Sequence, residues 1–336
     1  MPELRKDPIT REWVVFATER SKRPSDFHHK KEAALVQTKD HSNCPFCPGH
    51  ESATPPEILA YRPAGGASNA EDWSVRVVPN SFAALNQEGE PLVQKDGIYE
   101  SMPGVGRHEV IIETPEHGRS LAWLDVKQVE QVLLAYRDRY LSLRQDSRLK
   151  YILIFRNHGK VAGASLEHAH SQLIATPIIP QQAWVKIKGI ERYQEYYQRC
   201  VYCDIMQQEL GDGERIVAMN SSFLSFAPYA SRYPFETWIV PKERNAHFVN
   251  ISPAQIRELA AILKETLLRL DLCLDDPPYN YMLLTTDFTD NFHWHIEIIP
   301  RLSIAAGFEL GTGIYINVVA PEQAASYLRQ VKLEAA

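Results

Sequence analysis

The chain has 336 residues, of which 44% are hydrophobic and 23% charged, with a formal net charge of -6 at pH 7. This composition is typical of a folded globular protein with one large domain or two ordinary ones. The negative charge argues against a general nucleic-acid or membrane-surface binder, which needs a basic face. The charged amino terminus does not resemble a signal peptide, and no apolar run reaches membrane-spanning length, so we expect a cytoplasmic location.

Four of the five cysteines fall in two CxxC pairs, Cys44 with Cys47 and Cys200 with Cys203. Disulfides are rare in a reducing compartment, and neither pair opens a helix after a strand as a redox CxxC does. A CxxC pair can instead bring two thiolates to one metal ion. The sequence therefore predicts a metal site in each half of the chain.

The predicted elements occur twice in the same order. After the first CxxC pair come strands at 73–80 and 108–117, a helix capped by Asp125, a strand at 151–157 and the motif HAH. After the second pair come strands at 223–230 and 235–247, a helix capped by Ser252, a strand at 279–287 and the motif HWH. A repeat of this length indicates two tandem copies of one α+β domain.

Each half also offers two histidines in corresponding places. Two thiolates and two imidazoles complete a closed tetrahedral zinc site, which is structural because no position stays open for water or substrate. We therefore expect two structural Zn²⁺ sites per chain. His108 is an alternative to His117, and His295 an alternative to His293. The predicted ligands are Cys44, Cys47, His117 and His168 in the first half and Cys200, Cys203, His247 and His293 in the second.

The stretch EHAHSQLIA alternates as a strand does. Residues two apart in a strand share a face and lie roughly 6.5 Å from each other, so His168, His170 and Gln172 point the same way. With His168 on the metal, His170 lies on a rigid support beside the glycine-rich loop 159–165, whose N–H groups can hold a phosphate. A neutral imidazole there is a competent nucleophile toward phosphorus. The pattern predicts His170 as the nucleophile, with Gln172 and Ser165 donating hydrogen bonds to the phosphate.

The second copy lacks two of these features. It has Glu297 where the first copy has Gln172, and the acidic stretch DFTDNF where the first copy has glycines. A carboxylate and nearby aspartates repel a phosphate. We expect one catalytic half and one degenerate half that is kept for structure.

The motif His-x-His-x-Gln after FRNHGKVAGAS resembles the galactose-1-phosphate uridylyltransferase family of the histidine-triad superfamily, and the similarity covers almost the whole chain. It implies two histidine-triad-like domains, residues 1–180 and 181–336, each an antiparallel sheet with a packed helix. The same four first-half residues match the family's zinc ligands. The resemblance also implies a homodimer, in which the segment AAGFELGTG reaches the partner's site. The candidate substrate-binding residues are Arg20, Arg23, Asn80, Arg107, Asn157, Gly163, Ser165 and Phe308.

The family moves UMP from a nucleotide sugar to a hexose 1-phosphate by a ping-pong mechanism through a nucleotidyl-histidine. The second CxxC pair and the sequence GFELGTGIYIN resemble instead ADP-glucose phosphorylase, a relative that moves AMP and uses phosphate as acceptor. A third interpretation, from another class, is a histidine-triad hydrolase or a nucleotide-binding protein without turnover.

Overall fold

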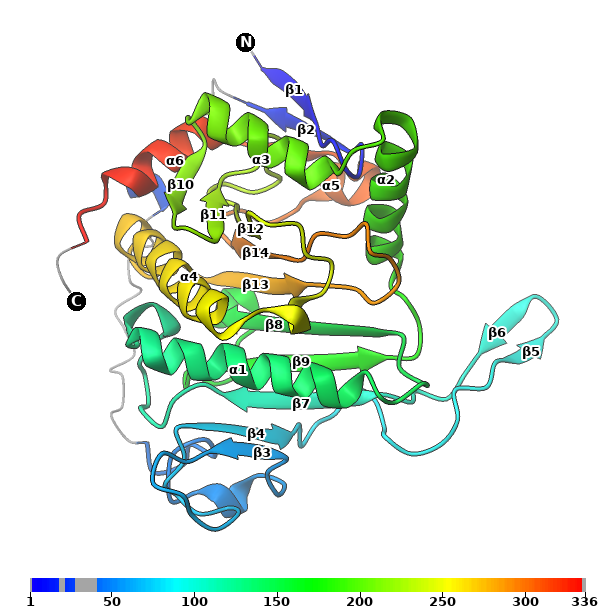
Figure 1. Ribbon diagram of the computed structural model, residues 1–336, viewed down its shortest axis with the longest axis vertical. Coiled ribbons are helices and arrows are strands. Elements are labelled where there is room, and N and C mark those ends of the chain that lie inside the picture. Colours follow the sequence, from blue (N-terminus) through cyan, green and yellow to red (C-terminus); the bar gives the residue numbers. More distant parts are fainter. Residues whose placement is uncertain (1, 18–21, 28–40, 334–336) are drawn as a thin grey trace.

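The computed structural model describes residues 2–17, 22–27 and 41–333. Arg20, one of the candidate substrate-binding residues, lies outside these ranges. Figure 1 shows a broad sheet whose strands run across the molecule, with α1 and α4 lying side by side on one face. The α+β class expected from the sequence is confirmed.

The strands are β1 (Glu3–Lys6), β2 (Trp13–Phe16), β3 (Leu59–Tyr61), β4 (Val75–Pro79), β5 (Gln94–Asp96), β6 (Tyr99–Ser101), β7 (Arg107–Ile112), β8 (Tyr151–His158), β9 (His170–Thr176), β10 (Ile216–Met219), β11 (Phe223–Phe226), β12 (Thr237–Pro241), β13 (Tyr279–Leu284), β14 (His295–Pro300) and β15 (Tyr315–Asn317). The helices are α1 (Val126–Leu143), α2 (Gln181–Tyr197), α3 (Val201–Asp212), α4 (Pro253–Leu274), α5 (Gly307–Thr312) and α6 (Pro321–Gln330).

The predicted repeat is visible in the strand order of the main sheet. The order is β3-β4-β7-β9-β8 in the first half and β10-β11-β12-β14-β13 in the second, and the two halves meet through β8 and β13. Both runs are antiparallel throughout. The two copies therefore form one ten-stranded sheet with an approximate twofold axis between β8 and β13 (Figure 1).

The helices cover the sheet unequally. Apolar residues of α1 and α4 pack on one face and join strands from both halves into a single core. On the opposite face α2 and α3 cover only the second half, where Ile187, Ile190 and Met206 pack against Phe226 and Trp238. The corresponding face of the first half carries the predicted site instead.

Both predicted helix caps are confirmed. Asp125 accepts a hydrogen bond from the backbone N–H of Gln128 at the start of α1. Ser252 and Gln255 form a reciprocal capping box at the start of α4. These caps satisfy amide groups that the first helical turn leaves without partners.

Candidate active site and metal centres

Strand β9 places the proposed nucleophile. His170, Gln172 and Ile174 pair with Ile112, Val110 and His108 of β7, so these residues share the sheet face that α1 does not cover. Ser171 points the other way, into a buried network with Tyr136 of α1 and Glu113. The alternation inferred from EHAHSQLIA is thus reproduced, although the regular strand begins at His170 and not before it.

The imidazole of His170 has one nitrogen bound and one free. Nδ1 lies 2.8 Å from the carbonyl oxygen of His168, and because a carbonyl can only accept, Nδ1 carries the proton. Nε2 therefore holds the lone pair, and the described residues give it no hydrogen-bond partner. Burial lowers the pKa of His170, which is only 5% exposed. A neutral imidazole with an accessible Nε2 is the form that can attack phosphorus.

Gln172 is joined through His108 to the turn that carries the candidate residue Asn80. The Oε1 of Gln172 lies 2.8 Å from His108 Nε2, and the backbone N–H of Ala84 donates to His108 Nδ1 at 3.2 Å. Asn80, at the end of β4, donates its backbone N–H to the carbonyl of His108 at 2.9 Å. His108 is therefore part of this face and not a ligand in the first Cys/His group, so the alternative to His117 is excluded.

The glycine-rich loop lies beside His170. Asn157 falls opposite His170 when the pairing of β8 with β9 is continued by one residue. A Cβ on Gly163 would lie 3.6 Å from the Nδ2 of Asn157, and the φ of Gly163 is +90°, a conformation that strains other residues. Ser165 is exposed on the same loop. The structure thus brings Asn157, Gly163, His170 and Gln172 to one place.

Three other candidates do not join this group. The alternation of β7 turns the side chain of Arg107 to the helix-covered face, where it contacts Asp146 at 3.5 Å, and its role in substrate binding stays a prediction. Arg23 is exposed, and its described contact is a backbone hydrogen bond to Asp26. Phe308 is 48% exposed on α5, a helix that contacts β15.

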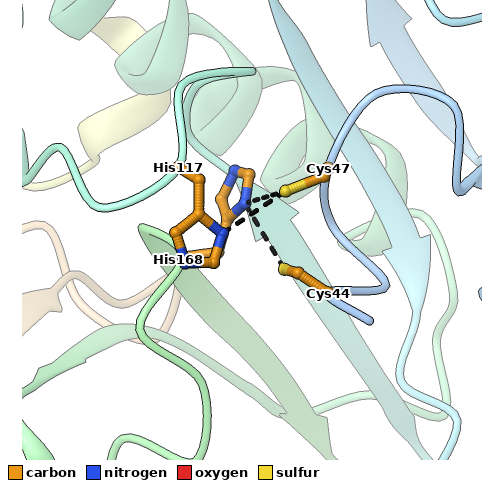
Figure 2. A group of neighbouring side chains, drawn as sticks. All are labelled: Cys44, Cys47, His117 and His168. Atoms are coloured by element: carbon orange, nitrogen blue, oxygen red, sulfur yellow. Dashed lines mark hydrogen bonds between the residues drawn. The ribbon is translucent and has the colours of Figure 1, made fainter. Parts of the chain in front are cut away.

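The first Cys/His group converges as predicted. Cys44, Cys47, His117 and His168 place their ligand atoms within 4.8 Å of one another (Figure 2). The sulfur of Cys47 lies 3.3 Å from Nδ1 of His117 and 3.6 Å from Nδ1 of His168. The Nε2 of His168 donates to the carbonyl of Thr114 at 2.7 Å, which directs the Nδ1 lone pair at the thiols.

This donor set fits a zinc ion. Burial raises the pKa of Cys47 to about 11, and neighbouring Cys44 adds to the increase. A cation is what allows two adjacent thiols to ionise, because it replaces the protons. Phe46, between the two cysteines, packs edge-on against His170 with ring centroids 5.3 Å apart. The loop that carries both cysteines therefore contacts His170.

The second group contains three of the four predicted ligands. Cys200, Cys203 and His293 lie within 4.8 Å of one another. His293 donates its Nε2 proton to the carbonyl of Pro241 at 2.7 Å, and its buried Nδ1 has no hydrogen-bond partner. An unpaired buried acceptor facing two thiols fits a metal ion. His295 is excluded as the alternative because its Nδ1 contacts the carbonyl of His293 at 2.9 Å.

His247 is not part of the second group. Its Nδ1 lies 2.9 Å from the carbonyl of Thr286, and its Nε2 lies 3.2 Å from Asp290. Asp287 is also 3.4 Å from the ring. The acidic loop 286–290, which stands where the first half has its glycine-rich loop, holds the imidazole, so His247 lies outside the described group and its role as fourth ligand stays a prediction.

Comparison with known proteins identifies the family. Residues 1–180 match the family described as galactose-1-phosphate uridyl transferase, N-terminal domain, and residues 125–333 match a domain of unknown function. The chain is 36% identical over 340 residues to ADP-glucose phosphorylase of Arabidopsis thaliana, covering 99% of this chain and 93% of that protein. It is 31% identical over 347 residues to galactose-1-phosphate uridylyltransferase of Thermotoga maritima, covering 99% and 100%. The chain belongs to the galactose-1-phosphate uridylyltransferase family.

Solved structures agree with this assignment. An ADP-glucose phosphorylase from Arabidopsis thaliana with bound ADP-glucose superposes with a TM-score of 0.83 at 35% identity, covering 99% of this chain and 100% of that one. A uridylyltransferase superposes with a TM-score of 0.74 at 27% identity, covering 98% and 97%. Curated members of the family are nucleotidyltransferases, and this chain is an enzyme of that class.

In the second half of this chain, the second histidine of the motif is buried and both of its ring nitrogens have partners. His295 Nε2, the equivalent of the free nitrogen of His170, lies 3.3 Å from Glu297. Burial alone would raise the pKa of Glu297, but Lys186, His295 and Arg232 together hold it well below its usual value. Glu297 pairs with Lys186 of α2 and with Arg232, the latter at 3.2 Å. The rings of Tyr202, Trp238 and Phe292 enclose His295, which is fully buried.

Two sets of functional contacts were missed by the sequence reasoning. Lys186 lies on a helix outside the repeat, and only the fold shows that this helix covers Glu297. Asn280, which pairs with Asn157 across the junction of the two halves, was not among the predicted site residues. The repeat spacing was the available signal for Asn280, whereas nothing in the sequence pointed to Lys186. Among the helices of the described residues, none combines the length and apolar character needed to cross a membrane.

Proposed function

We propose that this enzyme transfers UMP from a nucleotide sugar to a hexose 1-phosphate through a covalent nucleotidyl intermediate on His170. The observation that carries the proposal is the neutral, buried imidazole with its free Nε2 on a strand anchored by the first Cys/His group. Family membership supports the same chemistry.

The proposed reaction has two steps. Nε2 of His170 attacks the α-phosphorus, the P–N bond forms, and the bond to the sugar 1-phosphate breaks. The phosphate oxygen of the acceptor then attacks the same phosphorus and releases the imidazole. Catalysis is mostly positioning and charge stabilisation, for which the amides of Gln172 and Asn157 and the backbone of the loop 159–165 are placed. Asn80 lies on the turn that is joined to Gln172 through His108, and we propose that it contacts the nucleoside of the substrate.

A second candidate is adenylyl transfer from ADP-glucose to phosphate. The second CxxC pair in its Cys/His group and the 36% identity to ADP-glucose phosphorylase favour it. The chemistry at His170 is the same in both cases, and only the base and the acceptor differ. Turnover of UDP-glucose, UDP-galactose and ADP-glucose, each with galactose 1-phosphate or inorganic phosphate, decides between them.

We also propose that both Cys/His groups hold structural Zn²⁺. In the first, Cys44, Cys47, His117 and His168 would form a closed tetrahedral set that fixes the start of β9. In the second, Cys200, Cys203 and His293 are the described ligands, and the ion would join α3 to β14. In this scheme residues 1–180 carry the chemistry and residues 181–336 form the degenerate half.

A homodimer in the cytoplasm is the proposed form of the protein. The β5–β6 hairpin and its flanking loop project from the body of the molecule (Figure 1) and expose Leu92, Ile98 and Tyr99 by 69%, 89% and 72%. Exposed apolar clusters of this kind mark interaction surfaces. We propose that Phe308 of α5 contributes to the partner's site. Light scattering should give a mass of two chains, and a monomer at assay concentrations contradicts this part.

The nucleotidyl-histidine is tested by incubation with a radiolabelled nucleotide sugar and no acceptor. The expected result is about one label per active site in an acid-labile, base-stable linkage at His170, discharged when acceptor is added. His170→Ala should take up no label. His295→Ala, which changes the corresponding buried histidine of the second half, should still be labelled. Steady release of free nucleotide without acceptor would instead identify a hydrolase, and label on another residue contradicts the proposal.

A further inference from the structure

The loop after β8 is held by the second half of the chain. The ring of His158 stacks on Tyr279 of β13, with centroids 4.8 Å apart. Its Nε2 lies 2.7 Å from Asp276. The next residue, Gly159, is so close to Pro278 that an added Cβ would lie 3.0 Å from the proline Cβ. The glycine-rich loop of the catalytic half therefore starts on a support that the degenerate half provides.

Asn280 makes the most specific of these contacts. It lies opposite Asn157 in the pairing of β13 with β8. Its Nδ2 donates to Oδ1 of Asn157 and to the carbonyl oxygen of Ala162, each at 2.8 Å. One side chain thus binds both an amide of the predicted phosphate site and the loop that surrounds it.

These contacts fix which end of the Asn157 amide faces the site. A backbone carbonyl can only accept a hydrogen bond, so the atom of Asn280 next to Ala162 must be the nitrogen. The atom of Asn157 that faces this nitrogen must then be the oxygen. The NH₂ group of Asn157 is left on the other side, next to Gly163, with no acceptor among the described residues.

We propose that Asn280 is a positioning residue for nucleotidyl transfer, which holds the Asn157 amide with its NH₂ group toward the phosphate at His170. The inference rests on the proposed function, because it requires a phosphoryl group at Nε2 of His170. If the amide were inverted, its oxygen would face the phosphate oxygens and repel them. The catalytic half would therefore depend on the second half for the orientation of one of its donors.

The test compares a substitution that removes the amide of Asn280 with one that keeps its shape and replaces the donor by an acceptor. Asn280→Ala removes the donor and leaves Asn157 free to rotate, and we expect single-turnover labelling of His170 to slow on the order of tenfold. Asn280→Asp places a carboxylate oxygen where the donor was, which attracts the NH₂ group of Asn157 and turns its oxygen to the phosphate. We expect that variant to be slower by roughly another tenfold, because a hydrogen bond to a charged group is replaced by repulsion.

The same pair is then measured in the Asn157→Ala background. If Asn280 acts through Asn157, the labelling rates of the Asp and Ala variants should agree within about threefold in this background. The proposal is overturned if the Asp and Ala variants differ in labelling rate by the same factor when Asn157 is replaced by Ala. It is also overturned if their rates do not differ when Asn157 is present. Binding of UDP-glucose and ADP-glucose by calorimetry in all six proteins separates the maximal rate from affinity.

A stability control separates positioning from general weakening of the sheet. Leu284, at the other end of β13, packs against the cluster formed by α2, α3, β11 and β12. Leu284→Ala should lower the thermal midpoint at least as much as Asn280→Ala but leave the labelling rate within about threefold of the native value. If the native protein binds neither nucleotide sugar and takes up no label, the proposed function and this inference both fail. If the native protein is labelled and the effects are independent of Asn157, only the inference fails.

Discussion

The two histidine strands of this enzyme have the same backbone and opposite accessibility. In each, the first histidine faces a CxxC pair and the second donates its Nδ1 proton to the carbonyl of the first. His170 then leaves Nε2 free beside a neutral amide, whereas His295 meets Glu297 at 3.3 Å. Both strands hold an imidazole in the same way, so on the proposed function the residue two positions later, Gln172 or Glu297, would decide whether the strand can receive a phosphate.

The cover over each strand reinforces this difference. In the second half α2 and α3 pack on the sheet face that carries His295, and α2 brings Lys186 to Glu297. A carboxylate and two cations thus lie beside His295, whereas the corresponding residue of the first half is the neutral Gln172. On the proposed function, the negative group that the second half carries in Glu297 would be supplied in the first half by the phosphate of a substrate.

Substitution of the predicted metal ligands should have the largest effect on the two halves. Structural zinc contributes about 10–16 kcal/mol of apparent binding free energy at neutral pH in small domains, so Cys44→Ser and Cys203→Ser should each lose one metal equivalent and on the order of 5 kcal/mol of stability. Cys44→Ser should also abolish labelling of His170, since its loop contacts that ring. Elemental analysis, thermal unfolding and labelling of both variants check this prediction. If Cys203→Ser loses as much labelling of His170 as Cys44→Ser for the same loss of stability, the two metal sites do not differ in their effect on His170.

The next largest effect should come from placing a glutamate, the residue found at Glu297, at position 172 of the first half. Gln172→Glu should give His170 the environment of His295 and reduce turnover by about 10³-fold, equivalent to about 4 kcal/mol of transition-state free energy. A carboxylate there repels the phosphate and competes for Nε2. Gln172→Met, which lacks the donor but carries no charge, is the control and should lose roughly tenfold. Steady-state kinetics decide, and Gln172→Glu activity close to that of the native enzyme would break the comparison.

The reciprocal change should have the smallest effect and a different readout. Glu297→Gln leaves Lys186 and Arg232 without their buried carboxylate, and removing one partner of a buried ion pair costs about 3 kcal/mol or more. Nucleotidyl transfer at His170 should stay within about threefold, because the group lies in the other half. Lys186→Met combined with Glu297→Gln should recover part of the stability. Denaturant unfolding measures both, and unchanged stability of Glu297→Gln is the contrary result.

The sequence was sufficient where local pattern and repeat agreed. The alternation of EHAHSQLIA, the helix caps at Asp125 and Ser252 and the four ligands of the first Cys/His group are all reproduced by the structure. It failed where a contact depends on elements far apart in the chain. His247 is held by the acidic loop 286–290, and Lys186 reaches Glu297 only because α2 folds over the second half. Alternation along β7 puts Arg107 on the face opposite His108, and this orientation could have been read from the sequence.

The pairing of Asn157 with Asn280 lies at the point where the two copies of the repeat meet. If the two halves were identical and related by an exact twofold axis, the two asparagine amides would be equivalent. Either one could then donate the hydrogen bond with the same energy. A single hydrogen bond between them is necessarily unsymmetrical. The carbonyl of Ala162 removes the degeneracy in this chain by selecting Asn280 as the donor. Duplication within one polypeptide thus lets a junction adopt one fixed polarity that an association of identical subunits could not maintain.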